Sequence, residues 1–373
     1  MKSRSILLIA FAGVVCAGII ISCSKSNNNS TDNNTSTNKA ILTNIGNTII
    51  IPSFQNLSTA VNAMDAAIVA FNASPTTITL TAAQSSFKDA YLAWEACSEF
   101  SFGPASDQSL VTSNVNVFPT TVSTIQSNIN SGVYIIDAIG NLNAQGFPAL
   151  DYLLFSPDNT TVLARFTTDS KAANAKQYLA AVSGGIKSKA TAVLNAWLST
   201  GSNYISQFIN ATGVDAGSSL SLLVNGLVYD YDVILKNYKI GIPFGKYGPT
   251  TLPQDPTKVE AYYSGISVQL LIAQVQAIQN IYLGASGQGL DDKVASTNIQ
   301  KNGSPLNDVI KAEFTTLLTK LQALPASLSG AIQNNSSTVN DAYTEVQKLV
   351  VLLKVDMSSA LGVKISFQDD DGD

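Results

Sequence analysis

The helical spacing of apolar residues in long segments is the feature that most constrains how this chain can fold. In one segment Phe87, Tyr91, Trp94 and Cys97 recur every three or four positions, which places them on one face of a helix. The segments expected to be helical are residues 40–72, 81–100, 169–198, 218–239, 258–283, 305–324 and 339–361. The sequence therefore predicts an all-α protein of the helical-bundle type.

The predicted helices fall into two groups of similar helix content. Residues 201–217 interrupt the pattern near the middle of the chain, so we expect one half at residues 40–205 and a second at residues 206–373. The stretches that alternate like strands, residues 76–80 and 114–118, are too short and isolated to build a sheet. Because no repeat of about 30 to 40 residues is present, a helical solenoid is not supported.

The first residues have the layout of an export signal. Lys2 and Arg4 precede a long apolar run, and the run ends at Ser22-Cys23, which resembles the bacterial lipobox. We expect a lipoprotein signal peptide at residues 1–22 and lipidation of Cys23. An ordinary signal peptide or a membrane-spanning helix is the alternative, although the run is short for a span.

The segment after this cysteine is polar. Residues 24–38 contain no apolar side chain that could be buried, so we expect a disordered tether at residues 23–39. The predicted location is the bacterial outer membrane, on its periplasmic or its surface side. The expected partners are the membrane, through the lipid at Cys23, and proteins of an uptake system.

The absence of histidine excludes several kinds of site. Ser-His-Asp and Cys-His catalysis and His-Glu zinc motifs cannot form in this chain. Any metal would be bound by oxygen atoms, which suits hard cations. Of the three cysteines, Cys16 lies in the signal and Cys23 is the anchor, so Cys97 remains alone and is interpreted as structural. A formal net charge of −5 argues against a nucleic-acid partner.

Two helical segments carry candidate binding carboxylates. Glu95 and Glu99 are four positions apart on one predicted helix, where two carboxylates on one face could bind a hard cation. A solvated face with salt bridges is the structural alternative for this pair. Asp230 lies between Tyr229 and Tyr231, where phenol and carboxylate oxygens could form one site, or the tyrosines could simply belong to the core.

Two further stretches carry candidates. Residues 146–155 begin with glycine and proline and are apolar apart from Asp151, which predicts a short buried helix. A buried aspartate must be paired, protonated or bound to a ligand. Glu260 and Ser264 belong to a polar and aromatic run at the expected start of a helix, which predicts either a small pocket or a close helix–helix contact.

Taken together, these stretches resemble the imelysin-like family, also called the insulin-cleaving membrane peptidases and implicated in bacterial iron uptake. The resemblance covers the chain from about Ala40 onward. It is carried by Trp94 with Glu99, Phe102-Gly103-Pro104, Gly146-Phe147-Pro148-Ala149-Leu150-Asp151-Tyr152-Leu153-Leu154, Lys239-Ile240-Gly241-Ile242-Pro243-Phe244-Gly245-Lys246, Glu260-Ala261-Tyr262-Tyr263-Ser264 and Gly289-Leu290-Asp291-Asp292. The resemblance implies two four-helix-bundle-like halves packed together.

The family signature, Gly-x-His-x-x-Glu, is a proposed metal-binding motif, and this chain departs from it. Gly146 keeps the glycine, Pro148 stands at the histidine position and Asp151 replaces the glutamate. Proline has no side-chain ligand, and aspartate is one methylene shorter than glutamate. We therefore expect metal affinity through this motif to be weaker, altered or absent, with Glu99 and Asp151 as the candidate metal ligands.

Three functions are consistent with these features. The first is a lipid-anchored, non-catalytic binding protein for a metal, iron or another oxygen-liganded cation, or for a small ligand, in a groove between the halves. The second is an imelysin-type metallopeptidase, which the missing histidine disfavours. The third is a helical lipoprotein that binds a glycan or a protein, with sugar stacking on the tyrosines. The candidate ligand-binding residues are Trp94, Glu95, Glu99, Gly146, Pro148, Asp151, Asp230, Glu260 and Ser264.

Overall fold

Nearly all secondary structure in the computed structural model is helical, as predicted. The structure describes residues 28–248 and 252–367. In this part of the chain the strands are β1 (Gln300–Lys301) and β2 (Ser304–Pro305), a small antiparallel hairpin that pairs Gln300 with Pro305. No helix among these residues is long and apolar enough to cross a membrane. The expected signal peptide and Cys23 lie outside the described residues.

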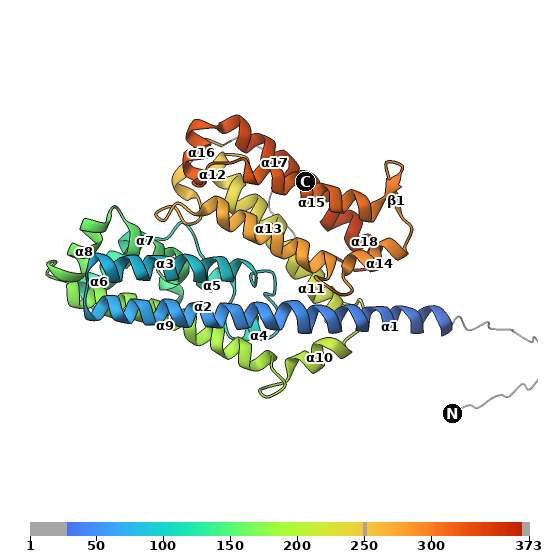
Figure 1. Cartoon of the computed structure of the whole chain (residues 1–373), viewed down its shortest axis with the longest axis horizontal. Coiled ribbons are helices and arrows are strands. Elements are labelled where there is room, and N and C mark those ends of the chain that lie inside the picture. The colour runs from blue at the N-terminus through green and yellow to red at the C-terminus, as the bar shows by residue number, and fades with distance from the viewer. Residues whose placement is uncertain (1–27, 249–251, 368–373) are drawn as a thin grey trace, which may run out of the picture.

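The first group of helices packs around a long helical rod formed by α1, η1 and α2, which runs horizontally through the lower part of the view (Figure 1). α2 packs along both α3 and α9, and rings such as Phe54 and Trp197 stack between them with centroids 6.2 Å apart. Burial of each such side chain contributes about 1.5–3 kcal/mol. The elements of this group are α1 (Asn28–Ile45), η1 (Gly46–Ile50), α2 (Ile51–Ala73), α3 (Thr77–Glu95), α4 (Pro104–Asp107), α5 (Thr112–Val115), α6 (Val122–Ser131), η2 (Ile139–Ala144), α7 (Gly146–Phe155), α8 (Asn159–Thr167), α9 (Ala172–Trp197) and α10 (Tyr204–Asn210).

The second group packs against α3 and α1 of the first and forms the upper half in Figure 1. Its core is built by α13, α15, α17 and η3, and α13 also contacts α3 across the boundary between the groups. The elements are α11 (Ser219–Tyr229), η3 (Asp230–Gly241), α12 (Ile242–Phe244), η4 (Pro256–Lys258), α13 (Ser267–Leu283), α14 (Leu290–Ser296), α15 (Leu306–Gln322), α16 (Leu328–Asn334), α17 (Ser336–Val350), η5 (Val351–Met357) and α18 (Ser358–Leu361). The division at residues 205 and 206 stays a prediction.

The start of the folded body differs from the expectation. Residues 28–39 were assigned to the disordered tether, but they lie in α1. Asn38 is buried because its amide donates to the Thr212 carbonyl at 2.7 Å and its oxygen accepts from Lys293 at 2.5 Å. Since these contacts are polar and distant in sequence, hydrophobic periodicity does not reveal them.

Pro52 follows a change of helical register within the first long helical segment. η1 is a π-helical turn, in which the Ile51 amide bonds to the Gly46 carbonyl five residues earlier. Pro52 comes at the start of α2, where its missing N–H is tolerated, so the helix continues.

Candidate ligand-binding site

A lysine and two glutamates form a fully buried ion-paired cluster between the two groups of helices. Nζ of Lys239, on η3, lies 2.6 Å from Oε2 of Glu95 at the end of α3 and 2.9 Å from Oε2 of Glu260. Glu95 is therefore not on a solvated face, as the structural alternative supposed, but forms its ion pair inside the protein. The cluster ties η3 to the first group by a contact between residues 144 positions apart.

Glu260 receives further hydrogen bonds from the first group. Asn116 donates its amide to Glu260 Oε1 at 2.7 Å, and the Tyr91 hydroxyl lies 3.3 Å from the same oxygen. That hydroxyl also donates to Asn116 Oδ1 at 2.5 Å. Glu260 precedes α13 rather than starting it, because Ala261 has a φ of 50° that an α-helix cannot contain.

Asp230, the first residue of η3, forms a second polar cluster on the same buried surface. Ser98 donates to its Oδ2 at 3.0 Å and Gln274 donates to the same oxygen at 2.6 Å. Glu99 is 1% exposed, and neither of its carboxylate oxygens has a hydrogen-bond partner among the described residues. The pair Glu95 and Glu99 is not on one helix, because α3 ends at Glu95 and the chain then turns.

Burial is the main cause of the altered acidity of these groups. It raises the pKa of Glu95 well above its usual value, with a contribution from the Glu260 charge, while Lys239 opposes the shift. Burial and the charge of Asp230 likewise raise the pKa of Glu99. The pKa of Asp230 is raised to about 6 by burial, against the hydrogen bond from Gln274. Burial works against the charge of Lys239, but the carboxylates of Glu260 and Glu95 outweigh it and raise the pKa of the ammonium group.

Asp151 bonds to backbone rather than to any side chain that could share a metal. Its two oxygens accept from the backbone amides of Tyr263 at 2.9 Å and Ser264 at 3.0 Å, so that α7 is joined to the loop before α13. Burial raises its pKa to about 6, although these amide bonds lower it. Of the alternatives of pairing, protonation or ligand binding, the structure shows a paired carboxylate, whose partners are two backbone amides.

Gly146 holds the start of α7 against a neighbouring loop. Its φ is +72°, and a Cβ at this position would lie 2.1 Å from the Val115 carbonyl oxygen. Only glycine satisfies both the left-handed backbone and the close approach.

We predict that Gly146→Ala destabilises the fold by at least about 2 kcal/mol, from left-handed strain and displacement of the Val115 loop. Gly140→Ala is the matched control, because its Cβ would meet nothing within 4 Å. Urea unfolding of both variants measures the difference. Equal midpoints would contradict the prediction.

A cavity of about 310 Å³ opens beside Asp230, and we call it the inter-half cleft. Its wall from the first group includes Ser98, Ser101, Val111, Asn116, Val117 and Phe118, and its wall from the second consists of Tyr229, Asp230, Ile234 and Tyr238. Buried polar atoms of Ser98, Asn116 and Asp230 meet half-exposed rings there, since Tyr229 and Tyr238 are 38% and 40% exposed.

The π-helical register of η3 explains why both tyrosines reach this cleft. Nine positions separate Tyr229 from Tyr238, which in an α-helix is about two and a half turns and would put them on opposite faces. A π-helix has roughly 4.4 residues per turn, so nine positions make about two turns. Because η3 spans Asp230–Gly241, Tyr229 and Tyr238 face the same side.

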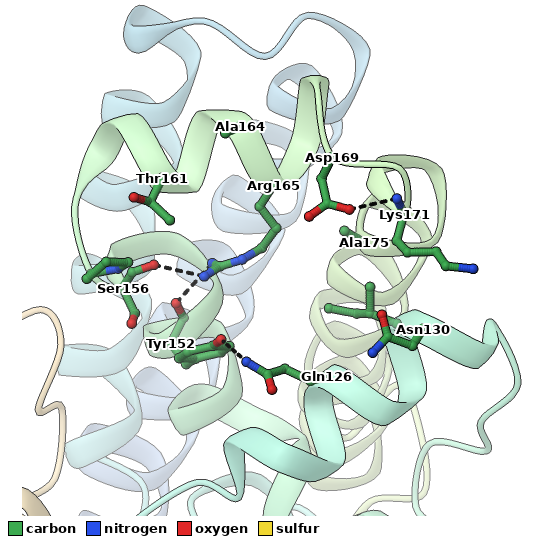
Figure 2. Close-up of a pocket in the computed structure, with 12 residues that line it drawn as sticks. Gln126, Asn130, Tyr152, Ser156, Thr161, Ala164, Arg165, Asp169, Lys171 and Ala175 are labelled. Atoms are coloured by element: carbon green, nitrogen blue, oxygen red, sulfur yellow. Dashed lines mark hydrogen bonds between the residues drawn. The ribbon is translucent and has the colours of Figure 1, made fainter.

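A second cavity, of about 430 Å³, is lined by residues of α6, α7, α8 and α9 (Figure 2). The Arg165 guanidinium donates to the carbonyls of Leu153 and Ser156, both at 2.8 Å, and stacks over the Tyr152 ring at 4.8 Å. These contacts satisfy the carbonyls at the end of α7. Arg165 therefore stabilises the C-terminus of the helix that carries Asp151.

The remaining candidates from the sequence are in packing or core positions. Trp94 is buried and packs near Phe147, with centroids 6.3 Å apart, and Pro148 and Ser264 belong to the α7 contact region. Tyr231 is 1% exposed and donates to the Val346 carbonyl, so it is a core residue and not a sugar-stacking surface. Asp232 is 0% exposed and is ion-paired with Lys236 at 2.7 Å.

Sequence reasoning missed Lys239, Tyr91, Asn116 and Gln274 as site residues. Periodicity identified Tyr91 only as a core position, and no local signal marked Asn116 or Gln274. All four residues have a polar partner more than 20 residues away along the chain, and for Lys239, Tyr91 and Asn116 that partner lies in the opposite half. A buried polar group on an apolar helix face is the signal that could have indicated Lys239.

The described residues do not fit a metal centre. No group of three or more histidine, cysteine, aspartate and glutamate side chains is arranged to hold an ion in this part of the chain. At the family motif Pro148 has no side-chain atom that could bind a metal, and the carboxylate of Asp151 is hydrogen-bonded to two backbone amides. The Lys239 ammonium already lies between Glu95 and Glu260.

The fold and the site define a helical protein of two packed groups with a ligand-sized cleft between them. The family model for imelysin, peptidase M75, matches residues 50–354. The chain therefore belongs to the imelysin family.

Two solved structures share this fold. An imelysin-like protein from Psychrobacter arcticum 273-4 has a TM-score of 0.69 and 17% identity over 89% of this chain and 98% of its own. A protein described as "a putative iron-regulated protein A precursor from Parabacteroides distasonis ATCC 8503" has a TM-score of 0.69 and 18% identity over 88% of this chain and 95% of its own. No curated protein matches the chain.

Proposed function

We propose that this chain is an exported, lipid-anchored binding protein that holds a small ligand in the inter-half cleft and does not cleave it. The cleft is the observation that carries the proposal, because both groups of helices contribute to it and three buried polar side chains, Ser98, Asn116 and Asp230, line it. Ligand sites are typically concave and mostly apolar, with a few placed polar groups.

The residues near the cleft support binding rather than hydrolysis. The chain has no histidine, and the thiol of Cys97 is buried, which raises its pKa and keeps it protonated. Glu95 and Glu260 are ion-paired with Lys239. Asp151 accepts from two backbone amides, and Asp230 accepts from Ser98 and Gln274. A metal-activated water would need an open ligand set, which these residues do not supply.

The setting of the proposed function is uptake across the bacterial envelope. The basic start, apolar run and Cys23 support export and a lipid anchor. The name of the Parabacteroides relative refers to iron regulation, and this favours an iron-related role for this chain as well. Iron would then be a transported ligand, or the nutrient whose uptake the protein accompanies, rather than a resident cofactor.

The glycan-binding alternative is weaker. It required Tyr229, Tyr231, Tyr262 and Tyr263 to converge on one exposed cleft. Tyr231 is instead in the core, and Tyr262 and Tyr263 pack with each other away from the residues that line the inter-half cleft.

A cleft-blocking variant tests the proposed site. We expect ligand-observed NMR with a library of amino acids, sugars, organic ammonium ions and ferric chelates to find saturable binding to the mature protein. Ser101→Trp, which fills the cleft, should abolish binding. Asn130→Trp is the matched control, because it places the same ring in the second cavity.

Circular dichroism and urea unfolding verify that both variants fold. Binding that persists in Ser101→Trp, or the absence of binding by every library class, would overturn the proposed site.

A further inference from the structure

We infer that the ligand of the inter-half cleft is an organic ammonium ion, held by Asp230 against the rings of Tyr229, Tyr238 and Phe118. This inference rests on the proposed function and names the chemical class that the site recognises. It begins from the charges of the cleft. Asp230 is the only charged residue among the described residues that line the cavity.

The buried groups behind Asp230 leave its negative charge only partly compensated. Glu99 lies close enough for the Asp230 charge, together with burial, to raise the pKa of Glu99. The nearest buried cation, Lys239, is already shared between Glu95 and Glu260. Lys239 thus already serves two buried carboxylates, and a ligand cation in the cleft would compensate the charge of Asp230.

The walls of the cleft are the kind that an alkylated ammonium group prefers. Rings attract a cation through their faces, and apolar side chains such as Ile234 and Val117 suit its methyl or methylene groups. An inorganic cation would need several oxygen ligands, whereas the walls offer mostly carbon. An anionic ligand would meet the carboxylate of Asp230 without a compensating positive charge.

The backbone holds this arrangement in place. The π-helical register of η3 brings Tyr229, Ile234 and Tyr238 to one side. The ring of Tyr229 is braced edge-on by Phe367, with centroids 5.3 Å apart. Asp230 is braced by Ser98 and Gln274. The carboxylate and the rings are therefore positioned before a ligand arrives, which reduces the ordering cost of binding.

Calorimetric titration with choline and with its neutral isostere 3,3-dimethylbutan-1-ol tests the inference. We expect saturable choline binding to the mature protein and at least tenfold weaker binding of the neutral alcohol. Asp230→Asn keeps the shape but removes the charge, and it should weaken choline at least tenfold while leaving the alcohol unchanged.

Two variants of Tyr238 separate the ring from its hydroxyl. Tyr238→Leu should weaken choline about tenfold, whereas Tyr238→Phe keeps the ring face and should stay within about threefold of the wild type. Because Tyr238 is 40% exposed, neither change endangers the fold.

The outcomes distinguish the two proposals. If a library compound binds in a manner sensitive to Ser101→Trp but choline does not exceed its neutral isostere, the ammonium class is wrong and the cleft remains the site. Choline binding that survives Asp230→Asn and Tyr238→Leu overturns the inference as well. If no compound depends on Ser101, both proposals fail.

Discussion

Lys239→Met is expected to destabilise the protein by about 3–5 kcal/mol, the largest effect of any single charge removal in the site. Lys239 lies 2.6 Å from Glu95 and 2.9 Å from Glu260, and all three side chains are at most 2% exposed. Methionine fills a similar volume but supplies no charge, so two buried carboxylates lose their common partner. They must then take up protons or draw in water. Urea unfolding at pH 7.5 measures the loss.

Lys293→Met is the matched control. Lys293 is also buried, but its ammonium donates to the neutral Asn38 oxygen and compensates no carboxylate. Its replacement should cost about 1 kcal/mol, the value of an ordinary hydrogen bond.

A second substitution tests the mechanism. Glu95→Gln in the Lys239→Met background removes one orphaned charge, so the double variant should be more stable than Lys239→Met alone. If both lysine variants lose the same stability, or if Glu95→Gln adds a further loss, then Lys239 does not act by neutralising these carboxylates.

The parts of the fold that depend on local spacing could be predicted from the sequence. Phe87, Tyr91 and Trp94 were expected on one helix face, and all three are buried. The spacing of apolar residues along a helix shows which of its faces is buried, but it does not show which element that face packs against. For the same reason the helical class was confirmed although several boundaries moved, as at α13, which begins at Ser267 rather than near residue 258.

The polar site could be predicted only in part. The resemblance to imelysins directed attention to Asp151 and Glu260, and the spacing of two carboxylates directed it to Glu95; all three lie in the contact region between the halves. Their partners could not be found in this way, because Lys239 and Glu95 are 144 positions apart and helical spacing does not show which buried polar residues meet. The cleft itself depends on the π-helical register of η3, and a search with the α-helical period places Tyr229 and Tyr238 on opposite faces.

Acidification from pH 8 to pH 5 should stabilise this protein, contrary to the usual behaviour of proteins whose carboxylates are salt-bridged. Asp151 and Asp230 have pKa values of about 6 in the folded state, above the ordinary value of 3.8, chiefly because they are buried. Burial raises the pKa of Glu95 and Glu99 in the same direction. Between pH 4 and 6 the folded state thus binds more protons than the unfolded state, and the free energy of unfolding falls as the pH rises through this window.

For Asp151 alone, a pKa of about 6 gives about 1.4 kcal/mol of added stability at pH 5 relative to pH 8. With Asp230 contributing in the same sense, the melting temperature should be roughly 5 °C higher at pH 5. Lys239 does not alter this slope, because its ammonium group, whose pKa is raised, stays charged throughout the range. Scanning calorimetry at both pH values measures the shift.

Variants that cannot titrate identify the groups responsible for the pH dependence. Asp151→Asn and Asp230→Asn should each reduce the gain in melting temperature between pH 8 and pH 5, whatever they do to stability at either pH. Asp158→Asn is the control, because hydrogen bonds from Thr161 lower the pKa of this exposed helix-capping carboxylate and place its titration below the window. A melting temperature that is flat or falls on acidification would show that the buried carboxylates are ionised at little cost. In that case the negative charge of these carboxylates would already be compensated within the protein. The argument for a cationic ligand in the cleft would then be weaker.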